Sequence, residues 1–256
     1  MARATSIRSK RNGRRSAILI MTAASLLAAG CSSSSSSSAT ANKADMTSVM
    51  LRASDLPNGW TSTGKSNPSD KATRAIASKI RVCQDFVAQS DLEKSQLKTS
   101  SADWRGPANS IGQRGSISNQ VVGYASENLA KTAYGVFASD STEACLNKTF
   151  EVALNQALGQ FGQSQGSNPS IKSNITRLGV SPAGDATTAY QVSVTLQMSG
   201  QTENVGFLVQ IVRLGPYVVT YNGTLYESAG EHFGSNLVDR SMARLEAASG
   251  ISGQGG

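Results

Sequence analysis

The sequence predicts an α+β fold: an antiparallel sheet meander with helices packed on one face, and one disulfide. Three observations predict this fold. Apolar residues recur at helical spacing in residues 126–159 and again in residues 233–248, and between these segments, in residues 190–221, they alternate with polar residues. Helices that flank a run of strands in this order are typical of a sheet covered by helices.

The first thirty residues are predicted to form a signal peptide. Residues 17–29 are apolar apart from Thr22 and Ser25. This stretch is shorter than the roughly 20 apolar residues that span a bilayer, but it matches the roughly 7–15 residues of a signal peptide core. Before it come six basic residues and no acidic residue: Arg3, Arg8, Lys10, Arg11, Arg14 and Arg15.

A cysteine directly follows small residues, in Leu26-Leu27-Ala28-Ala29-Gly30-Cys31. This pattern resembles the bacterial lipobox, in which the cysteine receives a diacylglyceryl group, although the lipobox prefers a larger aliphatic residue than Ala28. We therefore expect Cys31 to be lipidated, with membrane lipid as its partner, on the extracytoplasmic side of the cell membrane. The alternatives are an ordinary secretory signal in which Cys31 is incidental and, for the export route, the twin-arginine pathway suggested by Arg14-Arg15.

Residues 31–45 are predicted to be a lipidated, serine-rich tether, and residues 46–250 a single extracytoplasmic domain. Serine occupies every position of residues 32–38. Such a segment has no apolar surface to bury and forms a tether. About 210 residues remain after it, which is enough for one domain with its own core.

The charge of the mature chain disfavours nucleic acid as a partner. The full sequence has 24 basic and 17 acidic residues, and six of the basic residues lie in the leader. Removing these six leaves 18 basic against 17 acidic residues, a net charge of +1. A protein without a basic surface lacks the electrostatic attraction on which binding to phosphate backbones depends.

Cys83 and Cys145 are the two cysteines that remain once Cys31 is assigned to lipid. An isolated pair in an oxidising compartment is most simply a disulfide. Two buried free thiols or a redox pair are the alternatives, although redox pairs usually have the C-x-x-C spacing, which the sequence lacks. The disulfide would join a helix predicted over residues 70–88, with Cys83 on its apolar face, to the first turn of the helix after Asp140.

The first half of the domain is predicted to combine short helices and strands. A helix over residues 46–52 is expected to stop before Pro57, because proline disfavours helix in the residue before it. Trp60 is expected to cover an edge of the core. Strand-like segments surround Trp104 and run from Ile117 to Tyr124.

Two further helices follow this segment. Ser126 is expected to cap the first, and Asp140 to cap the second in a capping box with Glu143. Gly159 is expected to mark the stop of the second helix, because glycine is common just after helix ends.

The last third is predicted to be a meander closed by a helix over residues 233–248. One face of the strand over residues 190–198 is wet, because polar residues alternate there with apolar ones. These polar residues are Gln191, Ser193, Thr195 and Gln197. The other strands are expected at residues 174–180, 205–211 and 217–221.

Several of these features resemble the extracytoplasmic α+β sensor or lipoprotein domains of mycobacteria and their actinobacterial relatives. Some such domains stand alone as lipoproteins, and others form the outer part of membrane serine/threonine kinases. Kinase-linked members have two disulfides, whereas this chain can form one. The resemblance implies a cleft that binds a ligand or a partner. The features are the Leu56-Pro57-x-Gly59-Trp60 opening, the helix with Cys83, the helical block at 130–137 followed by Cys145, the meander and the final helix.

No pattern in the sequence predicts catalysis, and we expect the protein not to be an enzyme. His232 is the only histidine, and we interpret it as an exposed or capping residue, since no G-x-S-x-G motif accompanies it. Two segments, Ser62 to Lys65 and Ser95 to Lys98, match S-x-x-K, but the accompanying S-D-N and K-T-G motifs are absent. No cofactor and no metal site are expected either.

Two functions agree with these observations. In the first, helices and sheet enclose a cleft for an envelope ligand, which is a lipid, a glycolipid or a wall fragment. In the second, the protein is an accessory that holds or regulates another envelope protein. Against both stands the simpler interpretation that apolar faces only form the core and polar strand faces are only solvated. The candidate contacts for a protein partner are Ser193, Thr195, Gln197, Tyr221 and Tyr226.

Overall fold

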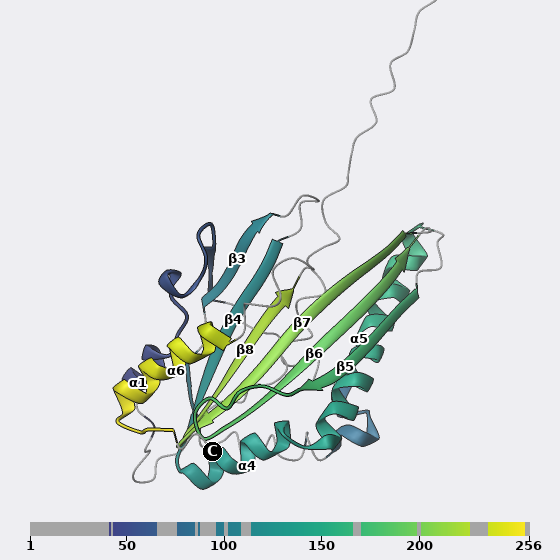
Figure 1. Ribbon diagram of the computed structural model, residues 1–256. Coiled ribbons are helices and arrows are strands. Elements are labelled where there is room, and N and C mark those ends of the chain that lie inside the picture. Colours follow the sequence, from purple (N-terminus) through teal and green to yellow (C-terminus); the bar gives the residue numbers. More distant parts are fainter. Residues whose placement is uncertain are drawn as a thin grey trace, which may run out of the picture.

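The computed structural model contains one antiparallel sheet with helices packed on it (Figure 1). Its path of strands is β1 (Thr61–Lys65), β3 (Ala102–Ala108), β4 (Arg114–Tyr124), β8 (Tyr217–Leu225), β7 (Gln201–Leu214), β6 (Ala186–Met198) and β5 (Ser170–Leu178). An eighth strand, β2 (Gln96–Thr99), pairs with β4. The structure describes residues 41, 43–65, 76–84, 87, 96–99, 102–108, 114–165, 170–198, 201–225 and 235–253. The predicted α+β class is confirmed.

The C-terminal meander follows the predicted alternation of apolar and polar residues, but its strands are longer than predicted. β6 starts at Ala186 and β7 ends at Leu214. The extra residues remain paired, as Thr187 does with Val212. Strand pairing continues there because the hydrogen bonds of a ladder join backbone groups and do not require an alternating side-chain pattern.

Helices cover both faces of the sheet, rather than the one face that was predicted. Val218 of β8 packs in a core cluster with α4 (Glu127–Phe137) and α5 (Asp140–Gln165). Its neighbour Val219 packs in a second cluster with α1 (Lys43–Ser48) and α6 (Ser235–Ser249). Successive side chains of a strand point to opposite faces. We call these the α4/α5 face and the α1/α6 face.

The two helical layers differ in where they lie along the sheet. α1 and α6 lie over β4 and β8, whereas α5 runs beside β5 (Figure 1). Leu237, Ser241 and Leu245 of α6 are buried as the helical spacing predicts, whereas Ala248 is exposed. Phe233, the first residue of the predicted apolar side, lies outside the described residues.

Trp60 packs at the edge of the α1/α6 core, as predicted. Its ring lies over Gly106 of β3, where an added Cβ would come within 3.0 Å of two ring carbons. A larger residue at position 106 would therefore displace the indole ring. The strands predicted around Trp104 and from Ile117 to Tyr124 are confirmed as β3 and β4, whereas β1 and β2 have no counterpart in the prediction.

The turn between β7 and β8 is held by a buried charge pair. Arg213 donates to Asp185 at 2.9 Å, and the backbone N–H of Gly215 donates to the same carboxylate at 2.7 Å. Gly215 has a φ of 53°, a conformation that favours glycine. The turn fixes how β8 leaves β7, and therefore which β8 residues share a face with which β7 residues.

The helix predicted over residues 70–88 is not continuous where the structure describes it. Turns occupy Ser78 and Lys79, Ile80 is extended, and a 3₁₀ turn, η3 (Arg81–Cys83), follows. The backbone N–H of Cys83 bonds to the carbonyl of Ile80, three residues before it, as 3₁₀ geometry requires. Cys83 is nevertheless fully buried, as the apolar spacing predicted.

Three helix boundaries differ from the prediction. α1 covers Lys43–Ser48 instead of residues 46–52, and the residues after it turn toward β4. Asp140 is the first residue of α5 rather than its cap, and α5 continues through Gly159 to Gln165. One glycine is too small a penalty to end a helix that has tertiary contacts. Ser126 does cap α4, by accepting a hydrogen bond from the N–H of Leu129.

Cys83 and Cys145 form the predicted disulfide, which joins η3 to the first turns of α5. Both cysteines are buried, and the hydroxyl of Thr149 lies 3.4 Å from the sulfur of Cys83. Ala77 completes this small cluster, with Ile80 and Val87 packed against it. The bond closes a loop with a sequence separation of 62 residues.

None of the described helices is long and apolar enough to cross a membrane.

We predict that the double variant Cys83→Ala/Cys145→Ala loses about 4 kcal/mol of unfolding free energy, because the unfolded chain regains the entropy of an open loop of this length. Urea unfolding of the variant and of the wild type measures the loss. Val82→Ala is the control, since Val82 is exposed beside Cys83 and its truncation should change the midpoint little. Equal stability of the double variant and the wild type would contradict a structural role for the disulfide.

Candidate functional site

A block of polar side chains lies on the α4/α5 face of two central strands. Three come from β4 and three from β8, and they sit opposite one another in the ladder. They share this face because they lie at every second position from Val122 in β4 and from Val218 in β8. Both valines pack with α4 and α5. We call them the polar block: Ser116, Ser118, Gln120, Thr220, Asn222 and Thr224.

The polar block meets an apolar strand on one side. On the same face, Val209 lies directly opposite Asn222, and Phe207 directly opposite Thr224. Both apolar side chains are buried in the core cluster. The face therefore changes from apolar to polar between β7 and β8, although β8 is paired on both sides.

The side chains of the block are partly buried. Thr220 and Thr224 are buried, with 3% and 9% of their surface exposed, whereas Ser116, Ser118 and Asn222 are half-buried. The hydroxyls of Ser116 and Thr224 hydrogen-bond each other at 2.9 Å.

One polar atom of the block lacks a partner. In the described part of the chain, Oδ1 of Asn222 is shielded from solvent and makes no hydrogen bond. A buried acceptor without a partner carries a desolvation penalty of about 1–3 kcal/mol, and such groups in folded proteins are rare enough to need an explanation.

None of the six block residues is ionisable. Arg105 of β3, opposite Ser116, is a charged side chain on the same face, and it is exposed. The arrangement can therefore donate and accept several neutral hydrogen bonds. Two cations lie at its rim, because Arg114, two residues before Ser116 in β4, shares this face with Arg105 and is also exposed. The block offers no carboxylate or imidazole among its members to move a proton near neutral pH.

Sequence reasoning missed this block. The prediction for β8 placed Tyr217, Val219 and Tyr221 on the apolar side, and these three are indeed buried. No role was predicted for Thr220, Asn222 and Thr224. The sequence does contain an indication of this block. Thr220, Asn222 and Thr224 occupy every second position after Val218, so all four share one face of the strand, and a valine on that face suggests that it is partly buried.

The predicted wet face of β6 is confirmed, and it extends over three strands. It lies on the α1/α6 face, beyond the part of the sheet that α1 and α6 cover. Thr195 donates to Asn204 across the strands at 2.9 Å. We call this surface the outer polar face; its exposed residues include Lys172, Asn174, Thr176, Gln191, Ser193, Gln197 and Asn204.

Tyr221, proposed from the sequence as a contact for a partner, does not belong to this surface. It is 4% exposed, and its hydroxyl hydrogen-bonds Ser241 of α6. Burial raises the pKa of Tyr221, and the side chain is part of the α1/α6 core. Tyr226, the other proposed tyrosine, lies outside the described residues.

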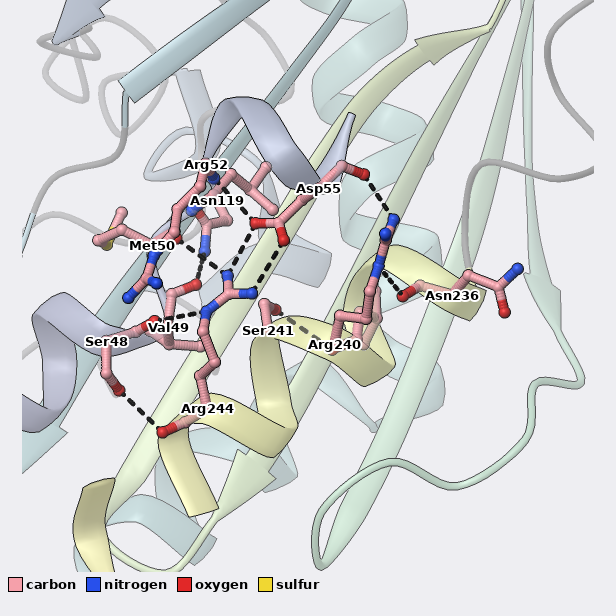
Figure 2. A network of polar contacts seen from close by, with 12 residues as sticks. Ser48, Val49, Met50, Arg52, Asp55, Asn119, Asn236, Arg240, Ser241 and Arg244 are labelled. Carbon is pink, nitrogen blue, oxygen red and sulfur yellow. Dashed lines mark hydrogen bonds and ion pairs between the residues drawn. The ribbon is translucent and has the colours of Figure 1, made fainter. Parts of the chain in front are cut away.

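A second polar cluster fastens the N-terminal segment to α6 (Figure 2). The carboxylate of Asp55, the last residue of the short turn η2 (Ala53–Asp55), accepts from two nitrogens of Arg244 at 2.9 and 2.8 Å. Arg244 also donates to the carbonyls of Ser48 and Met50. Arg240 donates to the backbone carbonyl of Asp55 at 2.6 Å.

Asn119 of β4 completes this fastening. Its side-chain nitrogen donates to the carbonyl of Val49 at 2.9 Å, and its oxygen accepts from the N–H of Leu51 at 3.1 Å. Asn119 is fully buried. A buried amide that is paired on both sides specifies one position for the chain that it contacts. All of these partners lie within the molecule, which makes the cluster structural rather than a ligand site.

The other residues selected from the sequence are not brought into one site. Ser62 is exposed in the edge strand β1. Cys83 and Cys145 are used by the disulfide. Cys31, Ser95 and His232 lie outside the described residues. Within those residues, no group of three or more His, Cys, Asp or Glu side chains is placed to hold a metal ion.

Comparison with known proteins does not identify a family. No family model matches the chain, and no curated protein matches it. Among solved structures, the chain is similar to the crystal structure of the extracellular domain of PknH from Mycobacterium tuberculosis, at 11% sequence identity and a TM-score of 0.35. The match covers 82% of this chain and 97% of that chain. A likeness this distant carries no argument about function, which rests on the residues of the site.

The Asp55 carboxyl should make stability fall in acid. Burial raises the pKa of Asp55, but the hydrogen bonds from Arg244 and from the backbone of Arg52, with the nearby positive charges, together hold the pKa below its ordinary value of 3.8. A carboxyl with a lowered folded-state pKa stabilises the fold above its unfolded pKa, and the stabilisation is lost as pH falls toward the folded pKa.

We predict that the unfolding free energy of the wild type falls more steeply below about pH 4 than that of Asp55→Asn. Denaturant titrations at several pH values between about 2 and 7 measure both slopes. Asp239→Asn is the control, because Asp239 is exposed on α6 and accepts no hydrogen bond from Arg244. Identical slopes for Asp55→Asn and the wild type would mean that this carboxyl does not couple folding to protonation.

Proposed function

We propose that the protein is a lipid-anchored, extracytoplasmic domain that binds an envelope ligand at the polar block and does not catalyse a reaction. The observation that carries the binding role is the partly buried polar block on the α4/α5 face, with its unpartnered Asn222 oxygen. Sites for small ligands usually combine an apolar wall with a few convergent polar groups. β7 provides apolar side chains beside the block.

The anchor and the compartment rest on the sequence. The basic leader, the short apolar stretch and the small residues before Cys31 together support lipidation. The buried disulfide between Cys83 and Cys145 supports an oxidising compartment. A diacylated cysteine holds a protein stably at a membrane, because two acyl chains give much stronger attachment than one.

The composition of the block supports binding rather than catalysis. General acid–base chemistry needs a group whose pKa lies near the working pH. The hydroxyls and amides of the block do not titrate in that range. The hydroxyl of Ser116 is bonded to that of Thr224 and not to an imidazole or carboxylate that would activate it as a nucleophile.

A second candidate function is an accessory that binds another envelope protein through the outer polar face. The exposed amides and hydroxyls of β5, β6 and β7 support this role. Polar strand faces are commonly just solvated, so we place this function behind ligand binding. Crosslinking in cells through a photoreactive residue at position 193 tests it, and recovery of no protein partner rejects it.

Lipidation is tested by replacing the modified cysteine. We predict that Cys31→Ala moves the protein from the membrane fraction to the soluble fraction and removes the mass of the acyl groups, because the hydrophobic attachment is lost. Fractionation and mass spectrometry of the intact protein measure both effects. Ser33→Ala is the matched control in the tether and should stay at the membrane. Membrane attachment of Cys31→Ala at unchanged mass would reject the anchor.

Ligand binding is tested by native mass spectrometry of the full chain after gentle extraction. We predict that wild-type protein retains an envelope molecule and that Ser118→Leu loses it, because leucine removes a hydroxyl from the block and adds a bulky apolar side chain among its polar groups. Ser193→Leu is the matched control, because Ser193 is an exposed serine on the outer polar face. Equal retention by both variants, or no retained molecule in the wild type, would reject the proposed site.

A further inference from the structure

We propose that the polar block takes an uncharged, hydroxyl-rich ligand, a saccharide, and that Oδ1 of Asn222 accepts a hydrogen bond from it. This inference rests on the proposed binding function and specifies the chemistry of the ligand. The observations that carry it are the unpartnered oxygen, the absence of ionisable groups among the six block residues, and the partial burial of the block.

The unpartnered oxygen indicates what the ligand must supply. An amide oxygen is an acceptor, so the missing partner is a donor. The cross-strand neighbours of Asn222 on its own face are Ser118 and Val209. Valine offers no donor, and in the described part of the chain Ser118 does not hydrogen-bond the oxygen. A ligand hydroxyl or amide N–H would therefore supply the hydrogen bond that the Asn222 oxygen lacks.

The other side chains of the block disfavour an acyl chain and an anion. Four hydroxyls and two amides line the same face, and burying them against a hydrocarbon tail would remove their hydrogen bonds to water without replacement. An anion would be expected to meet basic side chains inside the block, whereas Arg105 and Arg114 are both exposed at its rim. A saccharide donates and accepts through each hydroxyl, as these six side chains do.

Burial disfavours a folded protein as the occupant. Thr220 and Thr224 are at most 9% exposed, and the half-buried Ser118 and Asn222 leave only part of the block open. Stable protein interfaces bury about 800 Å² on each partner, far more than six partly covered side chains of this size offer. A small ligand, or one sugar unit of a longer chain, suits a partly buried group of this size.

The decisive variant is Asn222→Leu, because it should change stability and binding in opposite directions. Removing a buried acceptor that lacks a partner relieves a desolvation penalty, so we expect the melting temperature to rise by about 2–4 °C for a domain of this size. Saccharide affinity should fall about tenfold or more, because the ligand's donor loses its acceptor. A residue that only supports the fold would not show this combination.

The binding measurement uses the full mature chain in detergent and isothermal titration calorimetry. Three neutral probes are titrated: the N-acetylglucosamine trimer, a mannose trimer and a glucose trimer. We expect at least one to bind the wild type and to bind Asn222→Leu about tenfold more weakly. Gln191→Leu is the matched control, because it replaces an exposed amide on the opposite face; its affinity should equal that of the wild type.

Vesicles of phosphatidylglycerol and of phosphatidylcholine distinguish the remaining outcomes. If no saccharide binds and a lipid binds in a manner that Asn222→Leu weakens, the saccharide is rejected while the proposed binding function stands. If Asn222→Leu and Ser118→Leu change the binding of none of these probes and no envelope molecule is retained by the wild type, both proposals fail. A lowered melting temperature with unchanged saccharide binding would assign Asn222 to the fold alone.

Discussion

The pairing of β4 with β8 is the constraint on which the rest of the structure depends. It runs without interruption from Ser116 opposite Thr224 to Gly123 opposite Tyr217, and it joins the N-terminal strands to the C-terminal meander. A slip of one residue in this ladder would move every side chain of one strand to the other face. The register therefore decides both the composition of the two cores and the alignment of the polar block.

The N-terminal segment is positioned by contacts with β4, a strand of the same ladder, and with α6. Asn119 of β4 holds the backbone on either side of Met50, and Arg244 of α6 holds the Asp55 carboxylate (Figure 2). A buried ion pair adds little net stability over well-packed apolar residues, but breaking one partner leaves an uncompensated charge. We interpret the cluster as a device that selects one position for α1. Ala41, just before α1, is itself buried in the α1/α6 core.

The polar block occupies a place where an apolar row would have been more stable. β7 supplies buried Phe207 and Val209 to the same face, while β8 supplies Thr224 and Asn222 opposite them. Polar side chains at positions where a core would be apolar are expected at functional sites, where some stability is lost in favour of recognition. Two other buried side-chain atoms of the described chain, Nε1 of Trp104 and Oγ1 of Thr188, also lack a hydrogen-bond partner, but neither belongs to the polar block.

The sequence alone determined the elements that depend on neighbouring residues: the alternating meander, the Ser126 cap and the burial of Cys83. Helical and strand periods are local properties, so a single chain displays them. Tertiary structure decided which faces are covered, because burial depends on residues far apart in sequence. Helices were predicted on one face of the sheet, yet α4 and α5 pack on one face and α1 and α6 on the other. Only the β4 register could place Ser118 beside Asn222, and so form the candidate site.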